Sequence, residues 1–407
     1  MKNFVIPLVR LILLTVLFVP SLSKGQCNDE QITVIISLDG FRWDYPVKTN
    51  TPALNKIAAA GVKAEALIPS FPSKTFPNHY TLATGLVPDH HGLVNNAFYD
   101  REMDKPYAIG NKEARFNGAF YGGEPIWITA RKQGLITASY FWVGTDVSIN
   151  GMQPDYWKKY DGSVPFSQRI DTIISWLNLP EGKRPRLIMG YYHEPDGVGH
   201  NYGPDDKRTF ELITEIDHYT GILYDRIRAL PHSNCINFIV LSDHGMGPIT
   251  SEKNIALSEH IKEHWPVRPE GGNPNFNFYA EGSYADSVYL ALKPLEGISV
   301  WKAGEVPDHL NYGKNPRVGD VIAVADSSWS ITLNKPKKKF TGGTHGYDPA
   351  NTDMHAIFYA DGPAFKIGYV HPAFSNVHVY SLLAKLLGIE PAPTDGNIEA
   401  VRDMLKD

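Results

Sequence analysis

Six acidic and imidazole side chains have the chemical types and local spacing of metal ligands. They are Asp39, Asp196, His200, Asp243, His244 and His345. Borderline divalent ions such as Zn²⁺ bind oxygen and nitrogen ligands in roughly tetrahedral geometry, so six ligands suffice for two ions with three each. Two ions about 4 Å apart can hold both the attacking and the leaving oxygen of a displacement at phosphorus. The residues therefore predict metal-assisted phosphoryl chemistry.

A threonine at the start of a predicted helix is the candidate nucleophile. Pro77 suits a first helical turn, so the helix begins near Thr75. A hydroxyl at or near the N-cap lies beside free backbone N–H groups and the positive end of the helix dipole, which favour a phosphate or an alkoxide. Thr75 would then be a seventh ligand of the metal pair. The alternative is that Thr75 only caps the helix.

Each candidate ligand also has an ordinary structural interpretation. Asp39 precedes Gly40 and suits a turn, Asp196 follows Pro195 and suits another, and His345 suits a surface loop. These interpretations suffice for any one residue. Together, the residues favour a common site because they follow the predicted strands of one sheet.

Hydrophobic runs precede most of the candidate ligands. Continuous runs rich in β-branched and aromatic residues are typical of strands buried on both faces of a parallel sheet. Such runs occupy residues 32–38, 186–192 and 237–242. Each ends at an aspartate of the candidate set or one short loop before it, and ligands bind at the carboxyl ends of parallel strands.

The remaining periodicity predicts an α/β fold with a mostly parallel central sheet flanked by helices. Apolar residues on one face predict a long helix over 205–230, and a further helix is expected over 377–387. Residues 250–330 alternate short strands with turns and predict a small antiparallel insertion, with strands at Ser287–Leu292 and Val321–Ala325. The glycine-rich residues 341–348 predict a loop.

The chain ends and composition set further expectations. Residues 1–25 predict an export signal, because positive charge precedes the run LILLTVLFV and small residues follow it. We expect a single catalytic domain over 26–407 in a periplasmic or secreted protein; the alternative is a lipoprotein anchored at Cys27. No later run is long enough to span a membrane.

Cys27 and Cys235 pair or stay free; the sequence allows both. The net charge of −5 gives no reason to expect a nucleic-acid duplex as partner, and we expect a monomer.

Seven motifs together resemble the nucleotide pyrophosphatase/phosphodiesterase family of the alkaline phosphatase superfamily, over nearly all of residues 30–390. They are LDGFRWDY (38–45), PSFPSKTFPNHYTLATGLVPDHHG (69–92), GEPIW (123–127), DGSVPF (161–166), EPDGVGHNYGP (194–204), SDHGM (242–246) and GGTHGYDP (342–349). The resemblance is to the compact bacterial form that consists of the catalytic domain alone. It implies an alkaline-phosphatase-like fold and two zinc ions per chain.

The resemblance also implies a role for each candidate residue. Thr75 would attack phosphorus, while Asn96 and the backbone N–H of Phe76 would hold a non-bridging phosphate oxygen. The two implied zinc sites are Asp39, Thr75, Asp243 and His244 for one ion, and Asp196, His200 and His345 for the other. A covalent threonyl-nucleotide would form and then be hydrolysed by water.

The implied activity is cleavage of a nucleotide or dinucleotide at its α-phosphate, which releases a nucleoside 5′-monophosphate. Phe76 and Tyr160 stand where nucleotide-cleaving members place stacking residues, and Tyr191 and Trp142 are expected to line the same pocket or to pack in the core. Lys105 and Lys112 fall in a loop where some members place a lysine. The alternatives are a choline-phospholipid phosphodiesterase and a binding protein that keeps the fold without catalysis.

Overall fold

The computed structural model describes residues 1–2 and 31–406. An eight-stranded sheet forms its centre, in the order β19-β2-β18-β9-β1-β8-β6-β7. The strands are β1 (Ile32–Leu38), β2 (Val62–Ala64), β6 (Thr137–Tyr140), β7 (Tyr156–Lys158), β8 (Leu187–Tyr192), β9 (Ile236–Leu241), β18 (Phe358–Asp361) and β19 (Tyr369–His371). The three strands predicted from hydrophobic runs, β1, β8 and β9, are adjacent and fully buried.

The sheet is mixed but mostly parallel, as predicted. β9, β1, β8, β6 and β7 all run parallel. β18 is antiparallel to both of its neighbours, β9 and β2. The carboxyl ends of β1, β8 and β9 therefore meet at one edge of the sheet.

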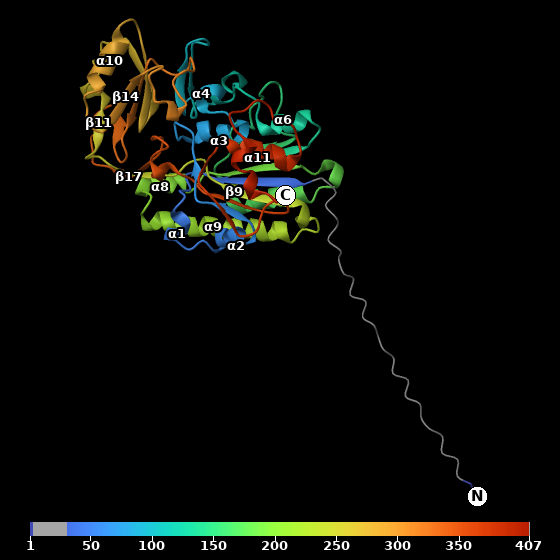
Figure 1. Ribbon diagram of the computed structural model, residues 1–407. Coiled ribbons are helices and arrows are strands. Elements are labelled where there is room, and N and C mark those ends of the chain that lie inside the picture. Colours follow the sequence, from blue (N-terminus) through green and yellow to red (C-terminus); the bar gives the residue numbers. More distant parts are fainter. Residues whose placement is uncertain (3–30, 407) are drawn as a thin grey trace.

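Helices cover both faces of this sheet (Figure 1). One face carries α3 (Thr75–Thr84), α6 (Ile126–Lys132) and α11 (His378–Leu387). The opposite face carries α2 (Pro52–Ala60), α7 (Phe166–Leu177) and α9 (Lys207–Arg228). Each side has its own cluster of buried side chains, because β1 sends alternate residues to opposite faces; Ile35 packs in one cluster, and Val34 and Ile36 pack in the other.

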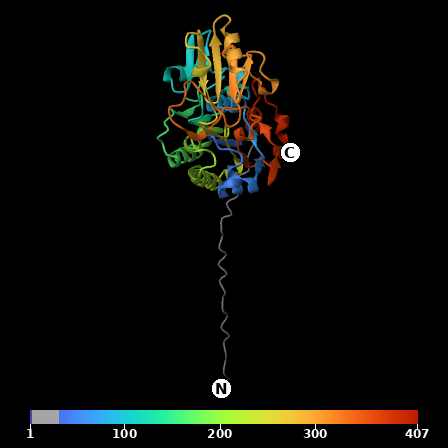
Figure 2. The same cartoon turned by 90° about the vertical axis from the view of Figure 1, so that its left-hand side faces the viewer.

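A smaller antiparallel sheet stands beyond one end of the central sheet, orange and yellow in Figures 1 and 2. Its order is β12-β13-β15-β14, and all of its pairs are antiparallel. The strands are β12 (Val267–Gly272), β13 (Asn275–Ala280), β14 (Ile298–Lys302) and β15 (Val321–Ala325). With α10 (Tyr284–Leu292) the smaller sheet encloses a third hydrophobic cluster.

Two local predictions in this part of the chain are wrong. Ser287–Leu292 is not a strand but the second half of α10, whose apolar Val288 and Leu292 lie four residues apart and face the smaller sheet. The predicted loop at 341–348 begins as strand β17 (Thr341–Thr344), which pairs with β10 (Gly247–Thr250). Its glycines lie against α8 (Asp196–Tyr202), where a Cβ on Gly342 or Gly343 would collide with the backbone of His200 or Gly199.

Shorter elements complete the chain. They are α1 (Tyr45–Lys48), α4 (Pro88–His91), α5 (Lys112–Arg115), β3 (Leu67–Ile68), β4 (Ala97–Asp100), β5 (Lys105–Ala108), β11 (Asn254–Ala256), β16 (Ser330–Thr332) and β20 (Phe374–Ser375). The expected export signal and the lipid-anchor alternative at Cys27 fall outside the described residues. Cys235 is disulfide-bonded. Within 1–2 and 31–406, no helix combines the length and apolar character that a bilayer crossing needs.

Candidate active site

The ends of three adjacent strands bring the candidate aspartates together. Asp39 directly follows β1 and Asp243 follows β9. Asp196 lies one short loop beyond β8, and its backbone N–H donates to the Asp39 carbonyl at 3.0 Å. Residues far apart in the chain are thereby neighbours, because parallel strands deliver their carboxyl ends to the same edge.

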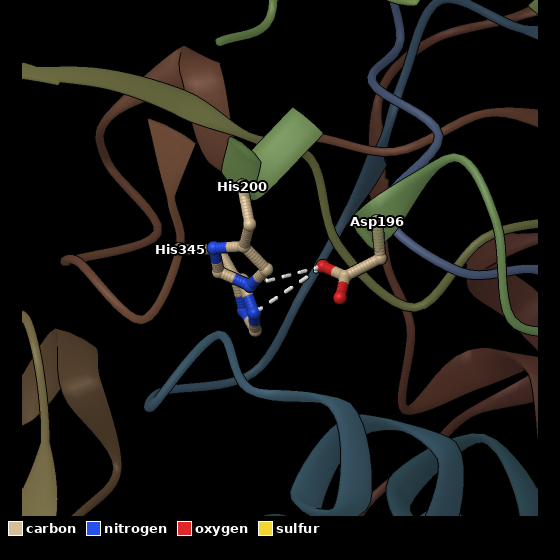
Figure 3. Close-up of side chains that lie close together, drawn as sticks. All are labelled: Asp196, His200 and His345. Carbon is tan, nitrogen blue, oxygen red and sulfur yellow. Dashed lines mark ion pairs between the residues drawn. The ribbon is translucent and has the colours of Figure 1, made fainter. Parts of the chain in front are cut away.

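The first candidate metal group consists of Asp196, His200 and His345 (Figure 3). Asp196 and His200 lie one turn apart in α8, and His345 follows β17. The Nε2 atoms of His200 and His345 lie 3.4 and 3.5 Å from the same Asp196 oxygen, Oδ1. Figure 3 shows the two rings and the carboxylate pointing toward one another.

The second candidate metal group consists of Asp39, Asp243 and His244, all buried. His244 Nε2 lies 3.0 Å from Asp243 Oδ2 and 3.5 Å from Asp39 Oδ1. The rings of His244 and His345 stack with centroids 3.6 Å apart, so the two metal groups adjoin. The Thr75 hydroxyl is 3.2 Å from His244 Nε2 and thus lies at the edge of this group.

Backbone carbonyls orient all three histidines of the two groups. His200 Nδ1 donates to Gly343 O and His345 Nδ1 donates to Ser73 O, each at 2.8 Å. His244 Nδ1 donates to a carbonyl at 2.9 Å. A carbonyl can only accept, so each Nδ1 carries a proton, and in the neutral imidazole the lone pair of Nε2 then faces the carboxylates. This is the tautomer that a metal-binding histidine with an outer hydrogen-bond partner adopts.

The three aspartates of the two metal groups also have oxygens that are free to bind a metal ion. One buried oxygen of each aspartate has no hydrogen-bond partner among the described residues: Asp39 Oδ1, Asp196 Oδ1 and Asp243 Oδ2. These are the oxygens nearest the histidine Nε2 atoms. The other oxygen of Asp39 accepts from the Tyr191 hydroxyl at 2.6 Å. Buried carboxylate oxygens without donors are costly unless a cation faces them, so the donor set fits two divalent metal ions.

The electrostatics of the site favour a bound cation. Burial, followed by the charge of Asp243, raises the pKa of Asp39 well above its usual range. Burial also raises the proton affinity of Asp243, but the adjacent His244 and His79 outweigh it and hold the pKa of Asp243 well below its usual range. Burial and then the neighbouring His244 lower the pKa of His345 far enough to keep its imidazole neutral.

The start of α3 differs slightly from the prediction. Lys74 occupies the N-cap position without a side-chain capping bond, and Thr75 is the first helical residue. The Thr75 side chain does not cap the helix; it turns toward His244 instead. The Phe76 N–H donates to Asn96 Oδ1 at 3.0 Å. That bond occupies the Phe76 N–H and fixes the orientation of the Asn96 amide.

A cavity of about 430 Å³ opens beside Thr75. Phe76, Tyr160, Tyr191 and Trp142 are among the residues that line it. Tyr160 is 37% exposed and offers a ring face, whereas Trp142 is 1% exposed and donates its indole N–H to the His79 carbonyl. Trp142 and Tyr191 therefore also serve structural roles. The volume lies within the range of small-molecule sites.

Sequence reasoning missed further residues of this site, and three of them are polar groups near its chemistry. Arg115 and Asp146 line the cavity, whereas Lys105 and Lys112 are exposed and lie outside its lining. His79, one turn after Thr75, packs between the rings of the cavity wall, and its Nδ1 lies 3.2 Å from Asp243 Oδ2. The spacing from Thr75 to His79 was a readable signal for the histidine; no local pattern indicates the other two.

Comparison with known proteins agrees with this geometry. Residues 33–348 match the family described as type I phosphodiesterase / nucleotide pyrophosphatase. The chain is 34% identical over 403 residues to human ectonucleotide pyrophosphatase/phosphodiesterase family member 1, covering 95% of this chain and 43% of that protein. It is 35% identical over 399 residues to the venom phosphodiesterase of Naja atra, covering 95% and 48%. The chain thus spans less than half the length of these curated relatives.

Solved structures show the same fold. An inactive variant of murine ectonucleotide pyrophosphatase/phosphodiesterase 5 in complex with AMP superimposes with a TM-score of 0.88 at 35% identity, over 93% of this chain and 100% of that one. The human counterpart superimposes with a TM-score of 0.89 at 34% identity, with the same coverage. The chain belongs to the type I phosphodiesterase / nucleotide pyrophosphatase family.

Proposed function

We propose that this protein is a zinc-dependent phosphodiesterase that cleaves nucleotides at the α-phosphate and releases a nucleoside 5′-monophosphate. The observation that carries the proposal is the joined pair of metal groups, stacked through His244 and His345, with the Thr75 hydroxyl at their edge. Asp39, Thr75, Asp243 and His244 would hold one ion; Asp196, His200 and His345 would hold the other. Bound zinc would supply Lewis-acid stabilisation of negative charge on the nucleophile and the phosphate.

The residues of the chain divide the reaction between them. Thr75 Oγ1 attacks phosphorus, a bond from this oxygen to phosphorus forms, and the bond to the leaving-group oxygen breaks. The N-terminus of α3 favours the deprotonated hydroxyl. Asn96 Nδ2 donates to the non-bridging oxygen on which charge develops, a contact whose loss can cost about 3 kcal/mol of transition-state stabilisation. Water then attacks phosphorus: a bond from the water oxygen to phosphorus forms, the bond from phosphorus to Thr75 Oγ1 breaks, and the nucleoside 5′-monophosphate leaves. The proton that Thr75 releases to solvent in the first step is balanced by one from this water, which restores the hydroxyl.

A nucleotide is the proposed substrate because the cavity next to Thr75 has both ring faces and polar groups. Phe76 and Tyr160 can stack on a base, and Arg115 and Asp146 can donate to and accept from its edge. AMP bound to the related murine protein supports the same class. A choline phosphodiester is the competing substrate, and a binding protein without turnover is the competing function.

Thr75→Ala tests the chemistry. We expect this variant to lose at least a thousandfold in kcat on p-nitrophenyl thymidine monophosphate while it still binds zinc through the six other ligands. Zinc content and turnover are measured on the same samples. A variant as active as the parent would overturn the mechanism. If the parent protein hydrolyses p-nitrophenyl phosphorylcholine faster than p-nitrophenyl thymidine monophosphate, the substrate is a choline ester and not a nucleotide.

The proposal extends to organisation and location. We take residues 26–407 as a single catalytic domain in which the segment at about 250–330 is an insertion; contacts from the smaller sheet to Lys74 and Asn95 support this. We also propose a monomer, exported to a periplasm or to the medium through residues 1–25. Size-exclusion chromatography with light scattering tests whether the protein is a monomer. N-terminal sequencing of the mature protein tests whether residues 1–25 are removed on export.

A further inference from the structure

We propose that Asn275, at the first position of β13 in the smaller sheet, is a positioning residue for the active site. It links the phosphate-binding Asn96 to the loop that carries the metal ligand His345. Asn275 belongs to neither metal group. The part of the inference that concerns turnover rests on the proposed function, whereas the part that concerns zinc affinity does not.

The contacts of Asn275 form a continuous chain of hydrogen bonds. Phe76 N–H donates to Asn96 Oδ1 at 3.0 Å, and Asn96 N–H donates to Asn95 Oδ1 at 2.8 Å. Asn95 Nδ2 donates to Asn275 Oδ1 at 2.9 Å, and Asn275 Nδ2 donates to Gly346 O at 3.0 Å. The chain therefore runs from the residue after the nucleophile to the residue after His345.

The direction of this chain is fixed at both ends. The Phe76 N–H can only donate and the Gly346 carbonyl can only accept, so reversing any one amide would place two donors or two acceptors face to face. Asn95 and Asn275 are almost fully buried, at 2% and 3% exposure, so water does not readily replace a lost bond. A buried network of this kind holds its members in one arrangement when every bond is satisfied.

Further contacts anchor the same hairpin turn of the smaller sheet to the site. Lys74, directly before the nucleophile, donates from Nζ to the Asn273 carbonyl. Thr344 Oγ1, directly before His345, donates to the same carbonyl at 3.3 Å. Ser73 joins the two loops, because its carbonyl accepts from His345 Nδ1 and its hydroxyl oxygen accepts from the Gly346 N–H at 3.1 Å. The turn at 272–275 thus contacts both sides of the reacting centre.

Asn275→Asp is the decisive substitution because it keeps the shape of the side chain. A carboxylate still accepts from Asn95 but cannot donate to Gly346 O. Asn277→Asp is the matched control: Asn277 lies two residues along the same strand, is equally buried, and donates to the Tyr312 hydroxyl instead of the His345 loop. It introduces the same charge and a similar loss of stability in the smaller sheet.

The measurements are zinc affinity by chelator competition, thermal unfolding, and steady-state hydrolysis of bis(p-nitrophenyl) phosphate, a diester without a base. We expect Asn275→Asp to lower kcat about 10- to 100-fold with KM within about threefold, and to weaken zinc binding about tenfold or more. Asn277→Asp should keep kcat and zinc affinity within about twofold. Should either aspartate variant fail to fold, Asn275→Ala and Asn277→Ala are compared in the same way.

A double-mutant cycle with Asn96→Ala tests whether Asn275 influences kcat through Asn96. If Asn275 acts through Asn96, Asn275→Ala costs less in kcat when Asn96 is already absent. The proposal is overturned if Asn275→Asp matches the parent in kcat and zinc affinity, if the Asn277 control loses as much, or if the cycle is additive. A parent that hydrolyses no phosphodiester would defeat the proposed function instead, and zinc affinity would still decide the role of Asn275.

Discussion

At the scale of single residues, the site contains buried carboxylates whose negative charges repel one another unless a cation lies between them. Asp39 Oδ1 and Asp243 Oδ2 both lack donors and both lie near His244 Nε2. The raised pKa of Asp39 follows from burial and from the charge of Asp243. Such a group binds its proton more tightly in the folded than in the unfolded protein. Its stabilising contribution is therefore present at low pH and is lost as the pH rises through the folded-state pKa.

Asp39→Asn should accordingly stabilise the metal-free protein. At pH 7.5 with a chelator, we expect its Tm to exceed that of the parent by roughly 2–4 °C, because the amide carries no buried charge and still accepts from Tyr191. The difference should shrink as the pH falls and Asp39 takes up its proton. With zinc the order should reverse. Differential scanning calorimetry of both proteins across pH checks this; a metal-free variant less stable than the parent at pH 7.5 would contradict it.

At the scale of elements, the turn after β1 contacts residues of both metal groups. Gly40 has φ +70°, and its backbone N–H donates to Asp243 Oδ1 at 3.2 Å. A Cβ at this position would lie 3.0 Å from Asp196 Cα and 3.2 Å from Asp196 Oδ1. The left-handed turn therefore needs glycine both for its backbone conformation and for the space next to α8.

Comparison of Gly40→Ala with Gly388→Ala should distinguish the cost of the backbone conformation from the cost of the clash with Asp196. Gly388 has φ +67°, and a Cβ added there would meet no atom within 4 Å, so it bears only the conformational cost, about 1 kcal/mol. We expect both variants to lose stability in calorimetry. Only Gly40→Ala should also weaken zinc binding, by about tenfold, because it displaces Asp196. Equal zinc affinities in the two variants would show that the turn has room to adjust.

At the scale of the whole molecule, the two metal groups draw their ligands from parts of the chain that lie far apart in the sequence. The three aspartate ligands follow strands of the central sheet, while His345 follows β17, which joins β10 and lies against α8. Bound metal would therefore tie the central sheet to the segment that leads from the smaller sheet.

Removal of zinc should destabilise the folded protein as a whole. Free zinc at about a thousand times its Kd adds about 4 kcal/mol of stability per site, so chelation should lower Tm markedly and added zinc should restore it. Asp196→Asn, which retains only one complete group, should show a smaller zinc-dependent shift. Thermal unfolding with and without chelator measures both. A parent Tm that does not respond to zinc would contradict the expectation.

Local sequence determined much of this protein. The runs at 32–38, 186–192 and 237–242 identified the three central strands because a strand buried on both faces must be largely apolar. The position of the aspartates directly after these runs, or one short loop beyond, predicted that they would meet. Thr75, before Pro77 at a helix start, was likewise visible in the chain. These features depend on neighbours within a few residues.

Only the tertiary structure decided the rest. The second half of α10 and strand β17 were mispredicted because contacts with the smaller sheet and with α8 override the local pattern. Arg115 enters the cavity wall from the end of the short helix α5, whose local sequence has no chemical signature of its own. Asn275 is an ordinary asparagine until folding places it between Asn95 and Gly346. Periodicity reports which face of an element is buried, but a hydrogen bond between distant loops depends on where the whole chain brings their backbones.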